Sequence, residues 1–123
     1  MVQHEEAHQV ALFQWVERVR ARYPLLKLLH AIPNGGLRSK ATAGKLKAQG
    51  VKPGVPDLCL PVARWGYHGL YIELKKPATK GSRAGVTSPD QREWIRELRE
   101  QGYRVEVAFG WEQAAEFLQG YLA

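Results

Sequence analysis

Residues 56–76 of the chain read PDLCLPVARWGYHGLYIELKK, two apolar runs joined by a short loop, ARWGYH. Within both runs the side chains alternate with the period of two that is typical of a β-strand. We therefore predict a hairpin of two antiparallel strands, residues 56–62 and 69–76, closed around Trp65. This hairpin supplies the centre of the predicted sheet.

The predicted register brings two acidic residues together. Residues whose numbers add up to 130 lie opposite each other, so Asp57 faces Glu73, and Lys75 shares the strand face of Glu73. Directly opposed side chains have Cβ atoms roughly 4.5–5.5 Å apart, and two carboxylates at that distance repel each other. A divalent cation would remove the repulsion, and Asp57, Glu73 and the backbone carbonyl of Leu74 are hard oxygen ligands that suit Mg²⁺ or Mn²⁺. The alternative is that Asp57 ends a turn while Glu73 and Lys75 form a solvated stripe.

The elements around the hairpin are helices and further strands. We predict helices over residues 5–22, 43–49, 89–101 and 112–121, and strands over residues 25–32 and 103–109. This order indicates one α/β domain over residues 1–123, with a central mixed β-sheet flanked by α-helices.

Composition excludes several classes of protein. The chain has 123 residues, of which 45% are hydrophobic and 24% charged, as in an ordinary globular domain. Its one cysteine excludes a disulfide framework and a cysteine-rich zinc site. No apolar run approaches the roughly 18 residues of a membrane span, and the N-terminus does not read as a signal peptide, so we expect a cytoplasmic location. The formal charge of +6 favours a polyanionic partner such as nucleic acid.

Several motifs carry a resemblance to known nucleases. Pro56-Asp57 followed by Glu73-Leu74-Lys75 resembles the PD-(D/E)xK nuclease signature, and more narrowly the chain resembles the small stand-alone phage and bacterial members of the VRR-NUC family. The segments that carry the resemblance are PNGG (33–36), GVKPGVPD (50–57), YIELK (71–75), SPDQ (88–91) and GYRV (102–105). The acidic signature alone is common, whereas GVKPGVPD in this order with it is much more specific. The resemblance covers nearly the whole chain and implies a restriction-endonuclease-like core.

The resemblance also implies an activity. The expected enzyme is an Mg²⁺- or Mn²⁺-dependent endodeoxyribonuclease that cuts Holliday junctions or other branched DNA, leaves 5′-phosphates, and works in the cytosol of a bacterium or a phage-infected host. One domain holds one catalytic centre, and symmetric cutting of two strands needs two, so we expect a homodimer with two-fold symmetry. The rival hypotheses are a catalytically silent nucleic-acid-binding module with the same fold, and an interaction protein whose basic face only keeps it in solution.

Three of the candidate catalytic residues are the signature itself. Asp57 and Glu73 are expected to hold one or two metal ions, and Lys75 to orient or deprotonate the attacking water or to stabilise charge on the phosphorus. Glu5 lies on the inward face of the first predicted helix. It matches the first-helix glutamate of the resembling family, which implies a direct or water-mediated metal ligand. The alternative is a favourable acid in the first turn of a helix.

Gln91 has two interpretations. Ser88, Pro89 and Gln91 form a good helix start, with Ser88 as N-cap and Gln91 closing a capping box. Gln91 also belongs to the inward stripe of the same predicted helix, and the resemblance implies an active-site glutamine at this place. Both interpretations stay open at this point.

A basic segment follows the PNGG motif. Its glycines allow close backbone approach to a phosphate, and nearby cations supply non-specific attraction. The candidate DNA-binding residues are Asn34, Arg38, Lys40, Lys45 and Lys52. The alternative is an ordinary turn followed by a solvated surface.

Two other patterns point to different chemistry. Residues 4–8, His-Glu-Glu-Ala-His, match the H-E-x-x-H motif of zinc proteases. No strand precedes the motif and no third ligand is evident, so we do not expect a zinc hydrolase. Cys59 lies on the same strand face as Asp57, but no histidine or asparagine at a suitable position supports a nucleophile, and a small semi-apolar strand residue is the simpler interpretation.

Overall fold

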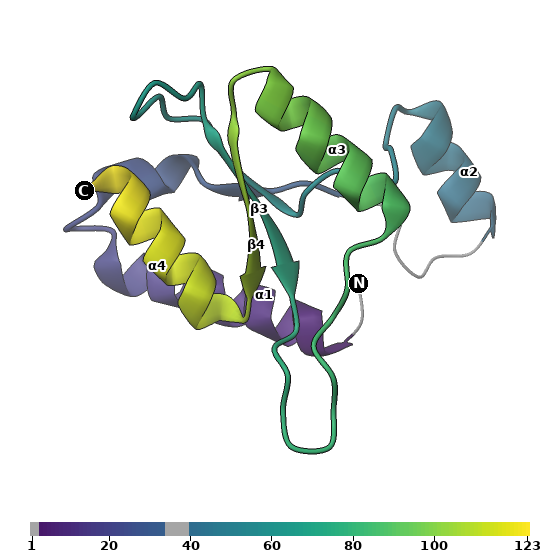
Figure 1. Ribbon diagram of the computed structural model, residues 1–123, viewed down its shortest axis with the longest axis horizontal. Coiled ribbons are helices and arrows are strands. Elements are labelled where there is room, and N and C mark those ends of the chain that lie inside the picture. Colours follow the sequence, from purple (N-terminus) through teal and green to yellow (C-terminus); the bar gives the residue numbers. More distant parts are fainter. Residues whose placement is uncertain (1–2, 34–39) are drawn as a thin grey trace.

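The structure is a computed structural model that describes residues 3–33 and 40–123 (Figure 1). Its elements, in chain order, are α1 (Gln3–Val19), the 3₁₀ helix η1 (Pro24–Leu28), β1 (His30–Ala31), α2 (Lys40–Ala48), β2 (Leu58–Leu60), β3 (Leu70–Lys75), α3 (Pro89–Glu100), β4 (Arg104–Phe109) and α4 (Trp111–Leu122). Within the described residues no helix has the length and hydropathy needed to cross a membrane.

The four strands form one mixed sheet in the order β1-β2-β3-β4. The β1–β2 and β2–β3 pairs are antiparallel, and β3 and β4 run parallel. Helix α1 packs against α4 and β3, whereas α3 packs along β4, and Figure 1 shows α3 and α4 on opposite sides of the β3–β4 pair. The predicted α/β fold, a mixed sheet flanked by helices, is confirmed.

The hairpin between β2 and β3 has the predicted register in its strands. The turn differs from the prediction, because the bridge that closes it joins Arg64 to Tyr67 and not to residue 66. The β2 side of the hairpin therefore has one extra residue between Leu60 and Arg64, in the segment that contains Pro61, and proline cannot donate a hydrogen bond to the sheet. Trp65 has a positive φ of 59°, and its indole N–H donates a 2.9 Å hydrogen bond to the carbonyl of Tyr121. The strand partners are Leu58 with Ile72, Cys59 with Tyr71, and Leu60 with Leu70.

The apolar face of β3 forms the centre of the core. Leu70, Ile72 and Leu74 are almost completely buried. They belong to one cluster with Leu12 of α1 and Leu118 of α4. Because burying one such side chain stabilises a fold by roughly 1.5–3 kcal/mol, this layer fixes β3 against the two helices.

The predicted strand over residues 25–32 is mostly wrong. Pro24 starts a 3₁₀ helix, and only His30 and Ala31 pair with β2. The buried residues of this run are Leu26 and Leu29, three positions apart, which is the repeat of a 3₁₀ helix. An apolar run of this length fits a strand and a helical turn equally well, and proline at the first position decides in favour of the helix.

Candidate active site

The end of the β2–β3 hairpin brings Asp57 beside Glu73. Asp57 precedes β2, and its backbone carbonyl accepts a 2.7 Å hydrogen bond from the N–H of Ile32. Its side-chain Oδ2 accepts another 2.7 Å bond from the backbone N–H of Leu74. The carboxylate is therefore held by β3 at the peptide that follows Glu73, as the predicted opposition of the two acids requires.

Glu73 is a buried carboxylate that lacks donors. Its side chain is 1% exposed, and neither carboxylate oxygen has a hydrogen-bond partner within the described residues. Burial raises the pKa of Glu73 from 4.5 to about 10; contact with the Asp57 carboxyl and its charge add to the rise, and Lys75 opposes it. Since two carboxylates offer each other only acceptors, a proton or a cation has to lie between them.

Helix α1 places Glu5 beside Lys75. Both residues are buried, at 9% and 7% exposure, whereas Glu6 is exposed. The Lys75 Nζ lies 3.8 Å from Glu5 Oε1. The prediction that Glu5 faces inward is confirmed, and the ion pair joins the first turns of α1 to the last residue of β3. The arrangement thus has three buried carboxylates and one buried ammonium at one end of the sheet.

The donor set fits a hard divalent cation. Orphaned oxygens of Glu73 next to the Asp57 carboxylate are the ligand chemistry of Mg²⁺ or Mn²⁺. Within residues 3–33 and 40–123, no group of three or more His, Cys, Asp or Glu side chains is placed to hold a metal by itself. Mg²⁺ commonly takes only one or two carboxylates, with waters and substrate phosphates as its other ligands. The roles of Glu5 and of the Leu74 carbonyl as further ligands stay predictions.

Gln91 closes the predicted capping box at the start of α3. Its side-chain Oε1 accepts a 2.8 Å bond from the N–H of Ser88, and Ser88 Oγ accepts a 3.1 Å bond from the N–H of Gln91. The capping interpretation is confirmed. The active-site role of Gln91 stays a prediction, although the half-buried side chain sits at the helix end that follows β3 in the chain.

Gly54 is a site-building residue that sequence analysis missed. Its φ is +91°, and a Cβ there would lie 2.7 Å from the backbone carbon of Asp90 in the first turn of α3. The loop that carries Asp57 therefore contacts the helix that carries Gln91 without a side chain between them. The signal was present in GVKPGVPD, because a glycine between two prolines often marks a close backbone approach.

The predicted DNA-binding residues divide into two groups. Lys40 and Lys45 on α2 and Lys52 after it are exposed, which agrees with both a phosphate-binding and a solvated surface. Asn34 and Arg38 lie outside the described residues. Helix α2 has no buried residues, and Figure 1 shows it beside α3 at the edge of the molecule.

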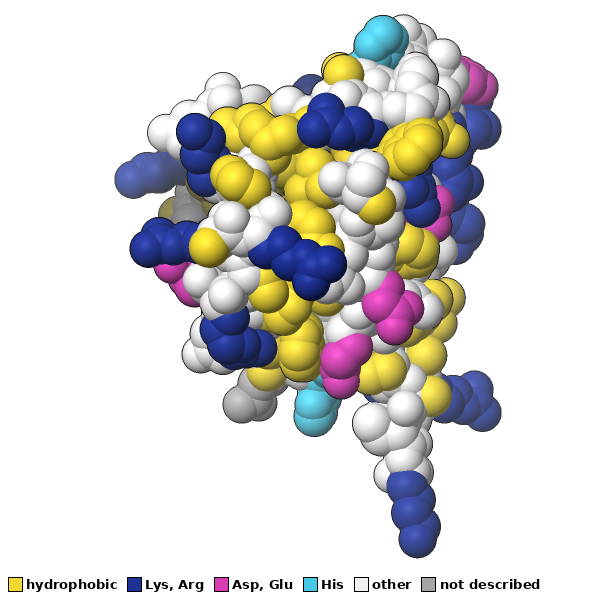
Figure 2. All heavy atoms as spheres, turned by 90° about the vertical axis from the view of Figure 1, so that its left-hand side faces the viewer, with side chains coloured by type: hydrophobic (Ala, Val, Ile, Leu, Met, Phe, Trp, Pro, Cys, Tyr) yellow, Lys and Arg dark blue, Asp and Glu magenta, His cyan; other side chains and the backbone are white. Residues whose placement is uncertain are grey.

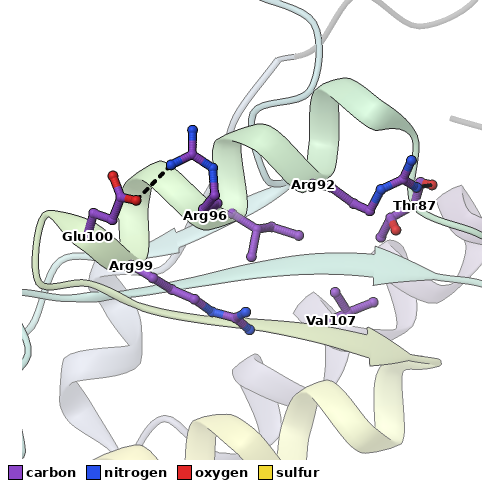
Figure 3. A pocket seen from close by; sticks show the side chains of 7 residues that line it. Thr87, Arg92, Arg96, Arg99, Glu100 and Val107 are labelled. Carbon is purple, nitrogen blue, oxygen red and sulfur yellow. Dashed lines mark hydrogen bonds and ion pairs between the residues drawn. The ribbon is translucent and has the colours of Figure 1, made fainter.

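An arginine-lined groove between α3 and β4 was not predicted. It has a volume of about 630 Å³, and Figure 3 shows side chains of α3 above and Val107 of β4 below. Arg92 donates to the carbonyl of Thr87, Arg99 donates to that of Val105, and Arg96 pairs with glutamates of α3. The guanidinium groups are thus engaged with the protein itself, and the bond from Arg99 links α3 to the edge strand β4.

The H-E-x-x-H pattern and Cys59 both have structural roles. His8 Nδ1 accepts a 3.1 Å bond from the N–H of Trp111 at the start of α4, while Glu5 contacts Lys75. Within the H-E-x-x-H pattern, His8 therefore contacts α4 whereas Glu5 contacts β3. Cys59 is buried, and desolvation raises the pKa of its thiol, which opposes a role as nucleophile.

Comparison with known proteins identifies the family. The family model described as VRR-NUC domain matches residues 3–111. A solved structure titled "VRR_NUC domain protein" superposes with a TM-score of 0.79 at 32% sequence identity, covering 99% of this chain and 90% of that chain. Among curated proteins, none matches the chain. With the family model spanning most of the sequence and a solved relative sharing its fold, the chain belongs to the VRR-NUC family of nucleases.

Proposed function

We propose that this protein is a divalent-metal-dependent endodeoxyribonuclease that cuts branched DNA. The observation that carries the proposal is the buried carboxylate of Glu73, which lies beside Asp57 and Lys75 and whose two oxygens have no hydrogen-bond donor among the described residues. A buried acid without a donor costs folding free energy. Such a cost is typical of a site that is completed by a ligand.

Asp57 and Glu73 would hold the cation, Mg²⁺ or Mn²⁺. When bound there, such an ion would supply polarisation of the scissile phosphate and a lower pKa for a water molecule. The backbone N–H of Leu74 donates to the Asp57 carboxylate and so holds it beside Glu73. Burial of the pair excludes bulk water, which strengthens every electrostatic interaction with the phosphate.

Lys75 would act on the nucleophile or on the phosphate. Its ammonium can orient the attacking water, or stabilise the negative charge that grows on the phosphate oxygens in the transition state. Glu5 holds this ammonium from the side of α1, at 3.8 Å. Attack forms a phosphorus–oxygen bond and breaks the bond to the 3′-oxygen, so the products carry a 5′-phosphate and a 3′-hydroxyl.

The substrate would be held by charge more than by base contacts. The exposed cations Lys40, Lys45 and Lys52 lie outside the buried site, and such cations bind phosphates with little dependence on sequence. One chain carries one such centre, so symmetric cutting of a four-way junction calls for a second copy, arranged as a homodimer.

The test is cleavage of a four-way junction and of its matching linear duplex, each with Mg²⁺, Mn²⁺ or EDTA. We expect metal-dependent cutting of the junction, abolished in Asp57→Asn while binding persists. Asp90→Asn is the matched control, because Asp90 is the one other aspartate of the chain and is exposed. Equal cutting of the duplex would remove the branched-DNA assignment. Cutting by Asp57→Asn at the wild-type rate would overturn the site, and binding of DNA without any cutting by the wild type would leave a silent binding module.

A further inference from the structure

A two-stranded arm leaves the body of the protein directly after β3. The arm consists of residues 76–86, and Figure 1 shows it projecting away from the sheet and helices. At its tip Thr79 and Ser82 exchange backbone hydrogen bonds of 2.9 and 3.0 Å across a two-residue turn. Gly81 supplies the positive φ of that turn, +85°. At its base the N–H of Gly85 donates to the carbonyl of Lys76 at 3.0 Å.

The charge of the arm has one sign. Residues 76–88 contain three basic residues and no acidic residue. The Lys76 ammonium is engaged within the arm, where it donates to Ser82 Oγ and to the carbonyl of Arg83. Lys80 and Arg83 are exposed, and across the described part of the chain neither takes part in an ion pair. Figure 2 shows the arm as a narrow projection with basic side chains at its end.

The base of the arm rests on the candidate catalytic lysine. A Cβ built on Gly85 would lie 3.2 Å from Cδ and 3.3 Å from Cβ of Lys75. Glycine therefore lets the returning strand pass directly over the Lys75 side chain. Because Lys75 is the last residue of β3 and the arm starts at the next residue, a DNA strand at the site lies next to the arm.

We propose that the arm enters a groove of the DNA duplex that flanks the cleaved phosphate, with Lys80 and Arg83 binding its phosphates. A two-stranded ribbon fits the major groove, which is roughly 12 Å wide and 8.5 Å deep. Four residues on each side of the turn, 76–79 and 82–85, at about 3.3 Å per residue give the arm a reach of about 13 Å. Lys80 and Arg83 have no acidic residue beside them in the arm, and this favours a polyanion such as DNA as the partner over an acidic protein surface. This inference rests on the proposed nuclease function.

The experiment compares the arm variant Lys80→Ala/Arg83→Ala with the wild type in binding to a labelled linear duplex, in EDTA, over a range of salt concentrations. Each phosphate contact contributes about 0.9 to the slope of log K against log salt. We therefore expect the slope to fall by about 1.8, and the affinity at 0.1 M salt to fall by tens of fold. Arg18→Ala/Lys27→Ala is the matched control, because it removes the same charge from exposed residues at the far end of α1 and beyond it.

Two further measurements separate the arm from general charge. Lys80→Arg/Arg83→Lys keeps both cations and should keep the wild-type slope. The same arm variant should lose much less affinity for a single strand of the same sequence, since a single strand has no groove. An unchanged slope in the arm variant, or an equal loss for single-stranded and duplex DNA, would overturn the proposal.

The outcome for the arm can be told apart from the outcome for the nuclease. If the wild type cuts with metal and the arm variant binds like the wild type, the nuclease stands and the arm proposal falls. If the wild type binds no DNA at any salt concentration, both fall. Thermal unfolding of each variant serves as the folding control, and we expect no change because the substituted side chains are exposed.

Discussion

The two faces of strand β3 are buried to nearly the same degree and have opposite chemistry. Leu70, Ile72 and Leu74 on one face are 0–1% exposed, while Glu73 and Lys75 on the other are 1% and 7% exposed. The apolar face packs into the core formed with α1 and α4. The charged face leaves both oxygens of Glu73 without a donor among the described residues. Burial alone therefore does not distinguish core from site, whereas a buried carboxyl group without a hydrogen-bond partner does.

The comparison predicts that stability and activity depend on different faces of the same strand. Substitutions that shorten a side chain on the apolar face reduce the buried apolar surface and leave a cavity, so they lower the free energy of unfolding. On the other face, Glu73→Gln removes a buried carboxyl that has no donor among the described residues, so it lowers activity while the metal-free protein keeps its stability near neutral pH. Neighbouring residues of one strand provide matched pairs for this test.

The largest effect is expected for Glu73→Gln on DNA cleavage. The amide keeps the size of the side chain but cannot supply the negative charge for a cation. Loss of a few kcal/mol of transition-state stabilisation lowers the rate on the order of a hundred- to a thousandfold. Single-turnover cleavage with Mg²⁺ measures the effect. Glu93→Gln, an exposed glutamate of α3, serves as the control and should cut normally; wild-type cutting by Glu73→Gln would remove this residue from the site.

The neighbouring substitution Ile72→Ala should act in the opposite way. Ile72 is 1% exposed in the core, and truncation of such a residue lowers the free energy of unfolding by about 2–5 kcal/mol. Urea unfolding measures the loss. Below the unfolding transition, cleavage per folded molecule should stay within a few fold of the wild type. A large loss of activity in fully folded Ile72→Ala would show that the two faces are not independent.

The parts of this comparison that follow from sequence are those fixed by local pattern. Alternation over residues 56–76 predicts both strands, their register and the opposition of Asp57 and Glu73, because the period of two determines which side chains share a face. The contact between Gly54 and Asp90 depends on how a loop meets a distant helix, which no local pattern specifies. The arm is likewise not specified by local pattern, because residues 76–86 show no apolar alternation and its tip is defined by two backbone hydrogen bonds between Thr79 and Ser82.

A smaller effect is expected for Glu73→Gln on stability, with a sign that depends on pH. The pKa of Glu73 is about 10 in the folded protein and about 4.5 as the ordinary value. Because the pKa is higher in the folded than in the unfolded protein, the protonated acid contributes to folding stability. This contribution is complete below about pH 4.5 and is lost progressively as pH rises toward 10. In EDTA, the Tm of Glu73→Gln should therefore rise relative to that of the wild type as pH increases from 5 to 9.

The same melting experiment includes the metal. Mg²⁺ or Mn²⁺ should raise the Tm of the wild type, more at pH 8 than at pH 5, because the cation competes with the proton for the carboxylate pair. In Glu73→Gln this metal-dependent shift should shrink toward zero. A wild-type Tm that is insensitive to metal at every pH would contradict the metal site, whatever the cleavage assay shows.

The smallest effect is expected at Gln91, where stability and activity have to be separated by choice of variant. Gln91→Ala removes the capping box and should lower the free energy of unfolding by about 0.5–1 kcal/mol. Gln91→Glu keeps an acceptor for the N–H of Ser88, and glutamate is favourable in the first turn of a helix, so its stability should match the wild type. If Gln91 also positions water or substrate, both variants lose cleavage although only one loses stability. If Gln91→Glu cuts like the wild type and Gln91→Ala loses activity only in proportion to its folded fraction, the residue is a cap of α3 and nothing more.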